Sequence, residues 1–166
     1  MKKWSPAAMK WLKIVHLILV ALFFGGIMSS VALSFRVNLH QYEETLDAYK
    51  AMVHVSDLIV RTGAVGTLLV GFVYGIFTSW GFFKHRWVTV KWILFIIQTV
   101  IGIFVVDKLM VENMDMLTAQ QAEAISNPTF IQNHALRQYA VIVQIGITLF
   151  IIAISVIRPW KKKKSS

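Results

Sequence analysis

Residues 139–157 read YAVIVQIGITLFIIAISVI, a run of 19 residues that contains no charged side chain. About 20 residues of α-helix cross a bilayer core of roughly 30 Å. A backbone in lipid must satisfy its own hydrogen bonds, which a helix does within one segment. This run therefore predicts a transmembrane helix.

Three similar runs precede it, at residues 14–34, 62–83 and 87–106, and only Lys91 interrupts the third. They account for a chain of 166 residues in which 57% are hydrophobic and 15% are charged. A soluble domain of this length would not hide four runs of spanning length. The sequence predicts one all-α domain over residues 1–166, an integral membrane four-helix bundle.

The connections between the runs differ in length and character. Residues 84–86 form a short inner loop, whereas residues 35–61 and 107–138 mix apolar with polar positions at helical spacing. The two longer connections predict helical extensions on the outer side of the membrane. Asn127 followed by Pro128 predicts a helix start, with Asn as N-cap and Pro at the first helical position.

The placement of charge predicts the orientation of the chain. Twelve of the 17 basic residues flank one side of the predicted spans: Lys2, Lys3, Lys10, Lys13, Lys84, Arg86, Lys91, Arg158, Lys161, Lys162, Lys163 and Lys164. All eight acidic residues lie on the other side. The positive-inside rule then predicts a multi-pass protein of the bacterial inner membrane, with both termini in the cytoplasm. The first run is too long for the apolar region of a cleaved signal peptide.

Composition also excludes several classes of protein. The net charge of +9 follows the topology and indicates contact with anionic lipid rather than nucleic acid. The absence of Cys excludes disulfides, thiolate metal sites, iron–sulfur clusters and thiol catalysis. The chain has no Walker A loop, dinucleotide-binding glycine pattern, HExxH or Gly-x-Ser-x-Gly motif.

Ionisable residues within spans are candidates for function. His16 and Lys91 lie at similar depth near the inner interface, and Gln98 follows Lys91 by two helical turns. Imidazole is a common ligand of haem iron, and a Lys amine ligates only when neutral. In the alternative interpretation, Lys91 extends to the inner headgroups and His16 bonds a neighbour.

A second polar stripe lies at the outer boundary. His54, Asp57 and Arg61 share a helical face, and Arg61 immediately precedes the second run. Its guanidinium is suited to a haem propionate, a substrate carboxylate or a lipid phosphate. An ordinary interfacial ion pair is the alternative.

A third stripe comprises His134, Arg137 and Gln144. The outer segments thus supply His40, His54 and His134, three imidazoles that would suit a metal ion or a second haem. Copper is the alternative metal, and solvated histidines are the alternative interpretation. Gly71 and Gly75 form a GxxxG pattern, which suits helix packing, including packing against a partner subunit or a second copy.

Three segments together resemble a known family. They are WLKIVH at 11–16, HRWVTVKWIL at 85–94 and RPW at 158–160. The combination is similar to HemJ-type protoporphyrinogen oxidases and the wider group of small CopD-like membrane proteins. Residues 136–141 lack the acid and Pro that HemJ-type proteins carry before their last helix, so the resemblance is to a divergent member.

The resemblance implies a b-type haem held by His16, with Lys91 and Arg61 as important partners. We therefore expect a membrane haem protein with a redox role, either electron transfer or oxidation of a tetrapyrrole or quinone-type substrate. His16 and Arg61 lie at opposite faces, so a second, outer haem is one version of this hypothesis. The alternatives are a copper-handling CopD-like protein and a non-enzymatic membrane partner subunit. Whether the chain is an enzyme stays open.

Overall fold

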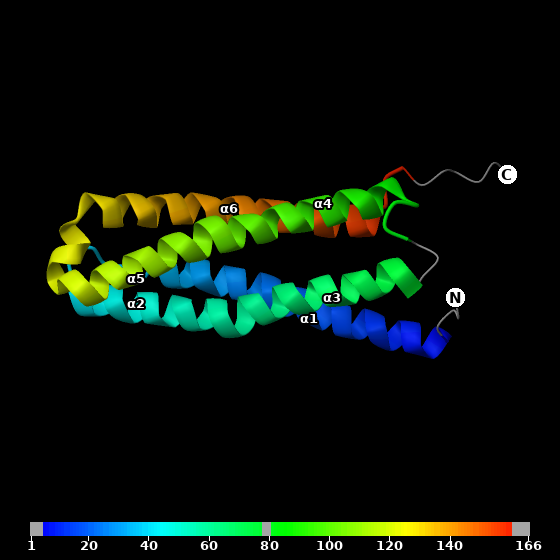
Figure 1. Ribbon diagram of the computed structural model, residues 1–166, viewed down its shortest axis with the longest axis horizontal. Helices are drawn as coiled ribbons and strands as arrows, with labels where there is room; N and C mark the ends of the chain where they lie inside the picture. Colours follow the sequence, from blue (N-terminus) through cyan, green and yellow to red (C-terminus); the bar gives the residue numbers. More distant parts are fainter. Residues whose placement is uncertain (1–4, 78–80, 161–166) are drawn as a thin grey trace.

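The computed structural model describes residues 5–77 and 81–160, which form an antiparallel bundle of four long helices (Figure 1). Within these residues there is no strand, so the predicted all-α membrane bundle is confirmed. The start of α1, the end of α3, the start of α4 and the end of α6 lie at the same end of the bundle. The helical segments in chain order are α1 (Pro6–Ser34), α2 (Tyr42–Val55), η1 (Ser56–Val60), α3 (Arg61–Phe77), α4 (Arg86–Ile101), η2 (Gly102–Asp107), α5 (Lys108–Gln120), η3 (Gln121–Ser126) and α6 (Pro128–Ile157).

The first and last helices, α1 and α6, each begin after a residue that caps them. The Ser5 hydroxyl accepts a hydrogen bond from the backbone N–H of Ala8, and the Asn127 side chain accepts one from Thr129. A proline follows each cap at the first helical position, where its missing N–H costs nothing. The helix start predicted at Asn127 and Pro128 is therefore confirmed.

The two middle helices are continuous through the predicted boundary between span and extension. Residues 42–77 form one helix of 36 residues, and residues 86–126 form one of 41. Each contains a π-helical segment, η1 in the first and η2 in the second, and the longer one ends in the 3₁₀ segment η3. The second predicted extension is helical from residue 107, as expected. The first, predicted over residues 35–61, is helical only from residue 42, because residues 35–41 form the turn between α1 and α2.

The inner end of the second run differs from the expectation. The apolar run extends to residue 83, but α3 ends at Phe77, and residues 78–80 lie outside the described residues. Gly81 has a φ of +57°, a left-handed conformation that suits a turn. Phe82 folds back against Gly75, so the apolar residues at the end of the run pack in a connection and not in a helix.

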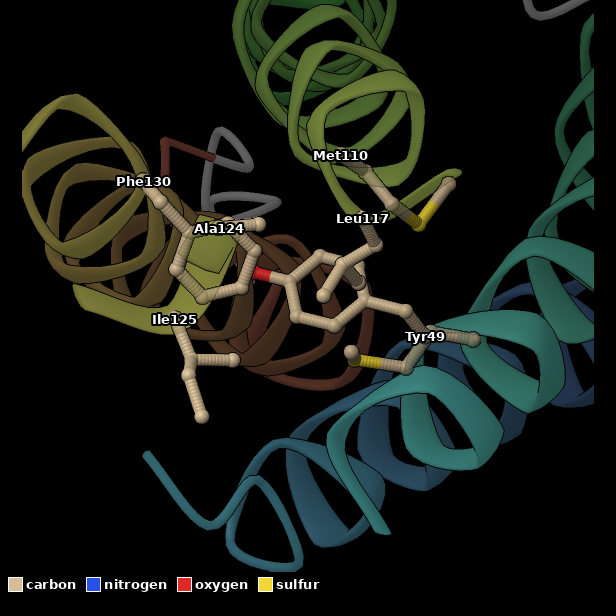
Figure 2. Close-up of a cluster of buried hydrophobic side chains, with 7 residues drawn as sticks. Tyr49, Met110, Leu117, Ala124, Ile125 and Phe130 are labelled. Atoms are coloured by element: carbon tan, nitrogen blue, oxygen red, sulfur yellow. The ribbon is translucent and has the colours of Figure 1, made fainter. Parts of the chain in front are cut away.

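The half of the bundle that contains α2 and α5, called the outer half after the predicted orientation, has a hydrophobic core of its own. It consists of side chains from α2, α5, η3 and α6: Tyr49, Met52, Met110, Leu117, Ala124, Ile125 and Phe130. Figure 2 shows Tyr49 reaching from α2 across the middle of this cluster toward Phe130. Burial of this many apolar side chains gives the outer half the packing of a soluble helical domain.

The other half of the bundle exposes apolar side chains instead. Leu69 of α3 and Phe150 of α6 are 62% and 54% exposed, although both lie within apolar runs. Four helices of the described part are long and apolar enough to cross a membrane, which assigns these faces to lipid. Lys2, Lys3 and the lysines at 161–164, which contribute to the predicted orientation, lie outside the described residues.

Candidate functional site

The inward face of α6 is unusually polar. Five buried polar side chains lie along it. From the adjacent pair of Asn133 and His134, one or two helical turns separate each from the next: Asn133, His134, Arg137, Gln144 and Thr148. Residues at this spacing share one helical face. The helix therefore turns its polar face to the centre of the bundle and its apolar face outward, as expected for a helix surrounded by lipid.

Arg137 is the most deeply buried cation of the described residues, with only 1% of its surface exposed. Its two terminal nitrogens donate to the hydroxyls of Ser30 and Ser34 on α1, the latter at 2.8 Å. Its Nε has no hydrogen-bond partner, and the guanidinium forms no ion pair with the described residues. Asp107 is the acidic group that interacts with it electrostatically, without touching it. A buried charge held only by hydroxyls is costly, which marks it as a candidate for function.

A cavity of about 390 Å³ lies beside Arg137, between α1, α3, α4 and α6. Both π-helical segments line it, η1 through Ser56 and η2 through Asp107. The Ser56 hydroxyl donates to Asp107 at 2.7 Å. π-Helical turns often occur at functional sites, because the extra residue redirects neighbouring side chains. The cavity has the size of a small-molecule site.

Arg61 lies at the outer edge of the same cavity. Its Nη2 is 3.0 Å from a carboxylate oxygen of Asp57 and 3.8 Å from one of Asp107. The ion pair with Asp57 is the ordinary interfacial ion pair that the sequence analysis gave as the alternative role of Arg61. The sequence did not predict the contact with Asp107. Through Asp107, which also interacts electrostatically with Arg137, Arg61 is connected to the buried polar groups around Arg137.

Gln98 forms the deeper part of the cavity wall and is fully buried. Its side-chain oxygen accepts from the Thr148 hydroxyl, and its backbone oxygen accepts from the Gln144 amide, both at 2.9 Å. Its side-chain nitrogen has no partner. Gln98 therefore joins the polar stripe of α6, and not His16 and Lys91 as the spacing on its own helix suggested.

A second cluster lies toward the inner end of the bundle, around His16. The His16 ring packs edge-on against Tyr74 of α3, with 5.8 Å between the ring centres. Its Nδ1 is buried and has no hydrogen-bond partner. Lys91 of α4 interacts electrostatically with His16, so these two residues of different helices lie near each other.

Two cations share an aromatic ring in this inner cluster. The Lys91 ammonium lies 5.2 Å and the Arg158 guanidinium 5.7 Å from the centre of the Trp87 ring. Cations at this distance are attracted by the ring quadrupole. All the acidic residues of the sequence belong to the segments at the other end of the bundle, so the inner cluster is positively charged.

The three outer histidines lie in different environments. His40 and His54 are exposed, whereas His134 is buried, with Tyr49 2.8 Å from one ring nitrogen and Gln138 3.1 Å from the other. The described residues contain no group of three or more His, Cys, Asp or Glu side chains placed to hold a metal ion. Asn113 donates to the Tyr49 hydroxyl at 2.8 Å, which makes His134 part of a buried hydrogen-bond network.

The predicted cofactor residues thus divide between two places. His16 and Lys91 belong to the inner cluster, and Arg61 and Gln98 line the central cavity. Sequence reasoning missed Ser30 and Asp107 as site residues. Ser30 and Ser34 carried a signal, since they are one helical turn apart within an apolar run, but the π-helical segments have no sequence signature.

Residues 10–159 match the family described as "Predicted integral membrane protein (DUF2269)". The chain belongs to this family. The match covers all four helices from within α1 to the end of α6, and it establishes an integral membrane protein. No curated protein and no solved structure matches this DUF2269 member. The family description does not include the HemJ-type or CopD-like assignment, which therefore stays an expectation.

Proposed function

We propose that this protein binds a b-type haem at the inner cluster and has a redox role in the membrane. One observation carries the proposal: the half-buried imidazole of His16 has a buried, unpartnered Nδ1 and lies near Lys91 of a different helix. Buried polar groups are nearly always hydrogen-bonded, so an exception needs an explanation. A metal–nitrogen bond to haem iron would provide one.

The other residues of the inner cluster fit a haem. The rings of Tyr74 and Trp87 provide aromatic walls, and the cations of Lys91 and Arg158 suit the carboxylates of haem propionates. No acidic side chain is present at this end to repel them. Tyr74 would orient the His16 ring through its edge-on contact. When bound, the haem would supply one-electron chemistry.

The proposed location follows from the charges described above. With both termini in the cytoplasm of a bacterium, the inner cluster lies near the cytoplasmic face of the inner membrane. The redox partner would then be a cytoplasmic or membrane-bound protein, or a small hydrophobic substrate in the bilayer. Arg61 and Gln98 are not part of this haem site, since they line a different cavity.

An absorption spectrum tests the proposal. The protein is expressed with ample haem, purified in detergent, and measured oxidised and then reduced with dithionite. A Soret band with sharp α and β bands on reduction is expected, and His16→Ala should abolish it. His54→Ala is the matched control, because His54 is exposed and lies on an outer segment.

Two results would overturn the proposal. A colourless wild-type protein would remove it, and metal analysis of chelator-free preparations would then examine the copper alternative. A haem spectrum that survives His16→Ala unchanged would place the haem elsewhere. Lys91→Met separates the two roles of Lys91, since a lost ligand changes the spectrum whereas a lost propionate contact weakens haem retention.

A further inference from the structure

The central cavity beside Arg137 has a polar outer end and an apolar remainder. Its charged side chains are Arg137, Arg61 and Asp107, so two cations face one carboxylate. Asp107 is already engaged by Ser56 and Arg61. The wall therefore has a net positive charge, and within the described residues the buried guanidinium of Arg137 forms no ion pair and has an unpartnered Nε.

The cavity is also positioned for a molecule from the bilayer. Arg61 immediately precedes the apolar run 62–83, and Asp107 immediately follows the run 87–106, so the charged end lies at the outer boundary of the spans. Val65 of α3 and Ile103 of η2 both line the cavity, yet they are 50% and 55% exposed. The cavity thus reaches the lipid-facing surface between these two segments.

The remaining wall is suited to an acyl chain rather than to a second charged group. Phe23, Ile27, Leu68 and Val141 provide apolar surface below the charged end. A volume of about 390 Å³ is at the low end of small-molecule sites, which favours a single chain over a two-chain phospholipid.

We propose that this cavity binds a single-chain amphiphile with a carboxylate head, such as a long-chain fatty acid. The carboxylate would accept hydrogen bonds from Arg137 and neutralise its charge. The acyl chain would extend between α3 and η2 toward the lipid. Planar carboxylates match guanidinium donors well. The inference does not depend on the haem proposal, because the two sites share no residue.

Photo-crosslinking in lipid nanodiscs tests this site. The probe is palmitate carrying a diazirine near the end of its chain, and crosslinked residues are mapped by mass spectrometry. Labelling is expected on α3 and η2 around Val65 and Ile103. Excess oleate should suppress this labelling, whereas oleyl alcohol, which has the same chain without the charge, should not.

Three variants refine the test. Arg137→Met should reduce site-specific labelling by about tenfold or more, the loss expected for one charged hydrogen bond. Ala64 lines the cavity. Ala64→Phe should therefore block the cavity without removing a charge, so it tests the site even where Arg137→Met fails to fold. Arg36→Met, which removes an exposed arginine at the outer end of the bundle, should leave labelling unchanged.

The proposal is overturned if oleyl alcohol competes as well as oleate. It is equally overturned if labelling spreads over the lipid-facing residues of all helices and ignores Arg137→Met and Ala64→Phe. Stronger competition by lysophosphatidate would replace the carboxylate with a phosphate head, and stronger competition by decylubiquinone would replace it with a neutral carbonyl. Either result contradicts the occupant proposed here.

Discussion

Arg137 shows how one residue can be held in a bundle without an ion pair. Its terminal nitrogens are satisfied by Ser30 and Ser34, while its Nε is buried without a partner. The two hydroxyls keep the guanidinium in place, but they do not neutralise its charge. We therefore expect removal of the guanidinium and removal of a hydroxyl to have different effects on stability.

Arg137→Met should leave the apparent Tm in detergent no lower than that of the wild type. The variant removes a buried, unpaired charge and replaces it with an apolar side chain of similar length. Ser30→Ala should instead destabilise by about 1–3 kcal/mol, because a terminal nitrogen of the buried guanidinium then lacks its acceptor. Circular dichroism melts measure both, and a large loss in Arg137→Met alone would assign the guanidinium a structural role.

Tyr49 connects the outer core to the buried network of α6. Its hydroxyl bonds both His134 and Asn113, and the residue is fully buried. Tyr49→Phe should lower the free energy of unfolding by about 1–3 kcal/mol, since both partners lose a hydrogen bond inside the core. Tyr139→Phe is the control, because Tyr139 is 70% exposed and should change stability little. Equal effects of the two substitutions would contradict the buried network.

At the scale of elements, α1 and α3 approach each other closely at Gly63. A Cβ there would lie 2.5 Å from the backbone nitrogen of Phe23, so α1 and α3 meet backbone to backbone. The GxxxG pattern of Gly71 and Gly75 serves a different purpose, since these glycines accommodate the rings of Trp92 and Phe82. Small residues thus permit close helix contact at one point and aromatic packing at two others.

A pair of substitutions separates close contact from helix propensity. Gly63→Ala should destabilise the protein, because neither backbone can move away without opening the α1–α3 contact. Gly25→Ala should leave stability unchanged or raise it by about 0.5–1 kcal/mol, since nothing lies within 4 Å and Ala favours a helix. Thermal melts of the two variants compare them directly, and a harmless Gly63→Ala would show that the helices are not in tight contact there.

The elements were predictable from the sequence to different degrees. The four runs gave the spans because hydropathy over about 20 residues is a strong signal, and Asn127 with Pro128 gave the start of α6 correctly. The predicted end of the second span at residue 83 was wrong, because residues 81–83 are not helical. Phe82 and Phe83 are as apolar as a span yet belong to a connection. The cavity was not predictable, since it depends on π-helical turns at Ser56–Val60 and Gly102–Asp107 that pattern reading does not detect.

On the scale of the whole molecule, the two middle helices are much longer than a membrane is thick. Residues 42–77 extend about 54 Å, and residues 86–120, before the break at Gln121, extend about 52 Å, against a bilayer core of roughly 30 Å. The half of the bundle with its own core therefore projects from the membrane. The charge distribution in the sequence predicts that it does so on the outer side.

Single cysteines test this orientation without background, because the chain contains no Cys. Asp47→Cys places a thiol on exposed surface of α2, and Lys84→Cys places one on the exposed connection before α4. In intact bacterial cells, a membrane-impermeant maleimide should label the first variant and should label the second only after permeabilisation. The reverse pattern would invert the topology and move the His16 cluster to the outer face.

The composition of the outer core also determines the order in which the protein can mature. Its side chains come from α2, α5, η3 and α6, segments that belong to two separate outer connections. With the orientation that the charges predict, each connection must be translocated before its residues can meet those of the other. Until the second of these connections has crossed the membrane, Tyr49 and Met52 have no packing partners from α5 or α6. Closure of this core is thus a late event in biogenesis, and a nascent chain arrested before α5 would expose an apolar surface to the cell's quality-control proteases.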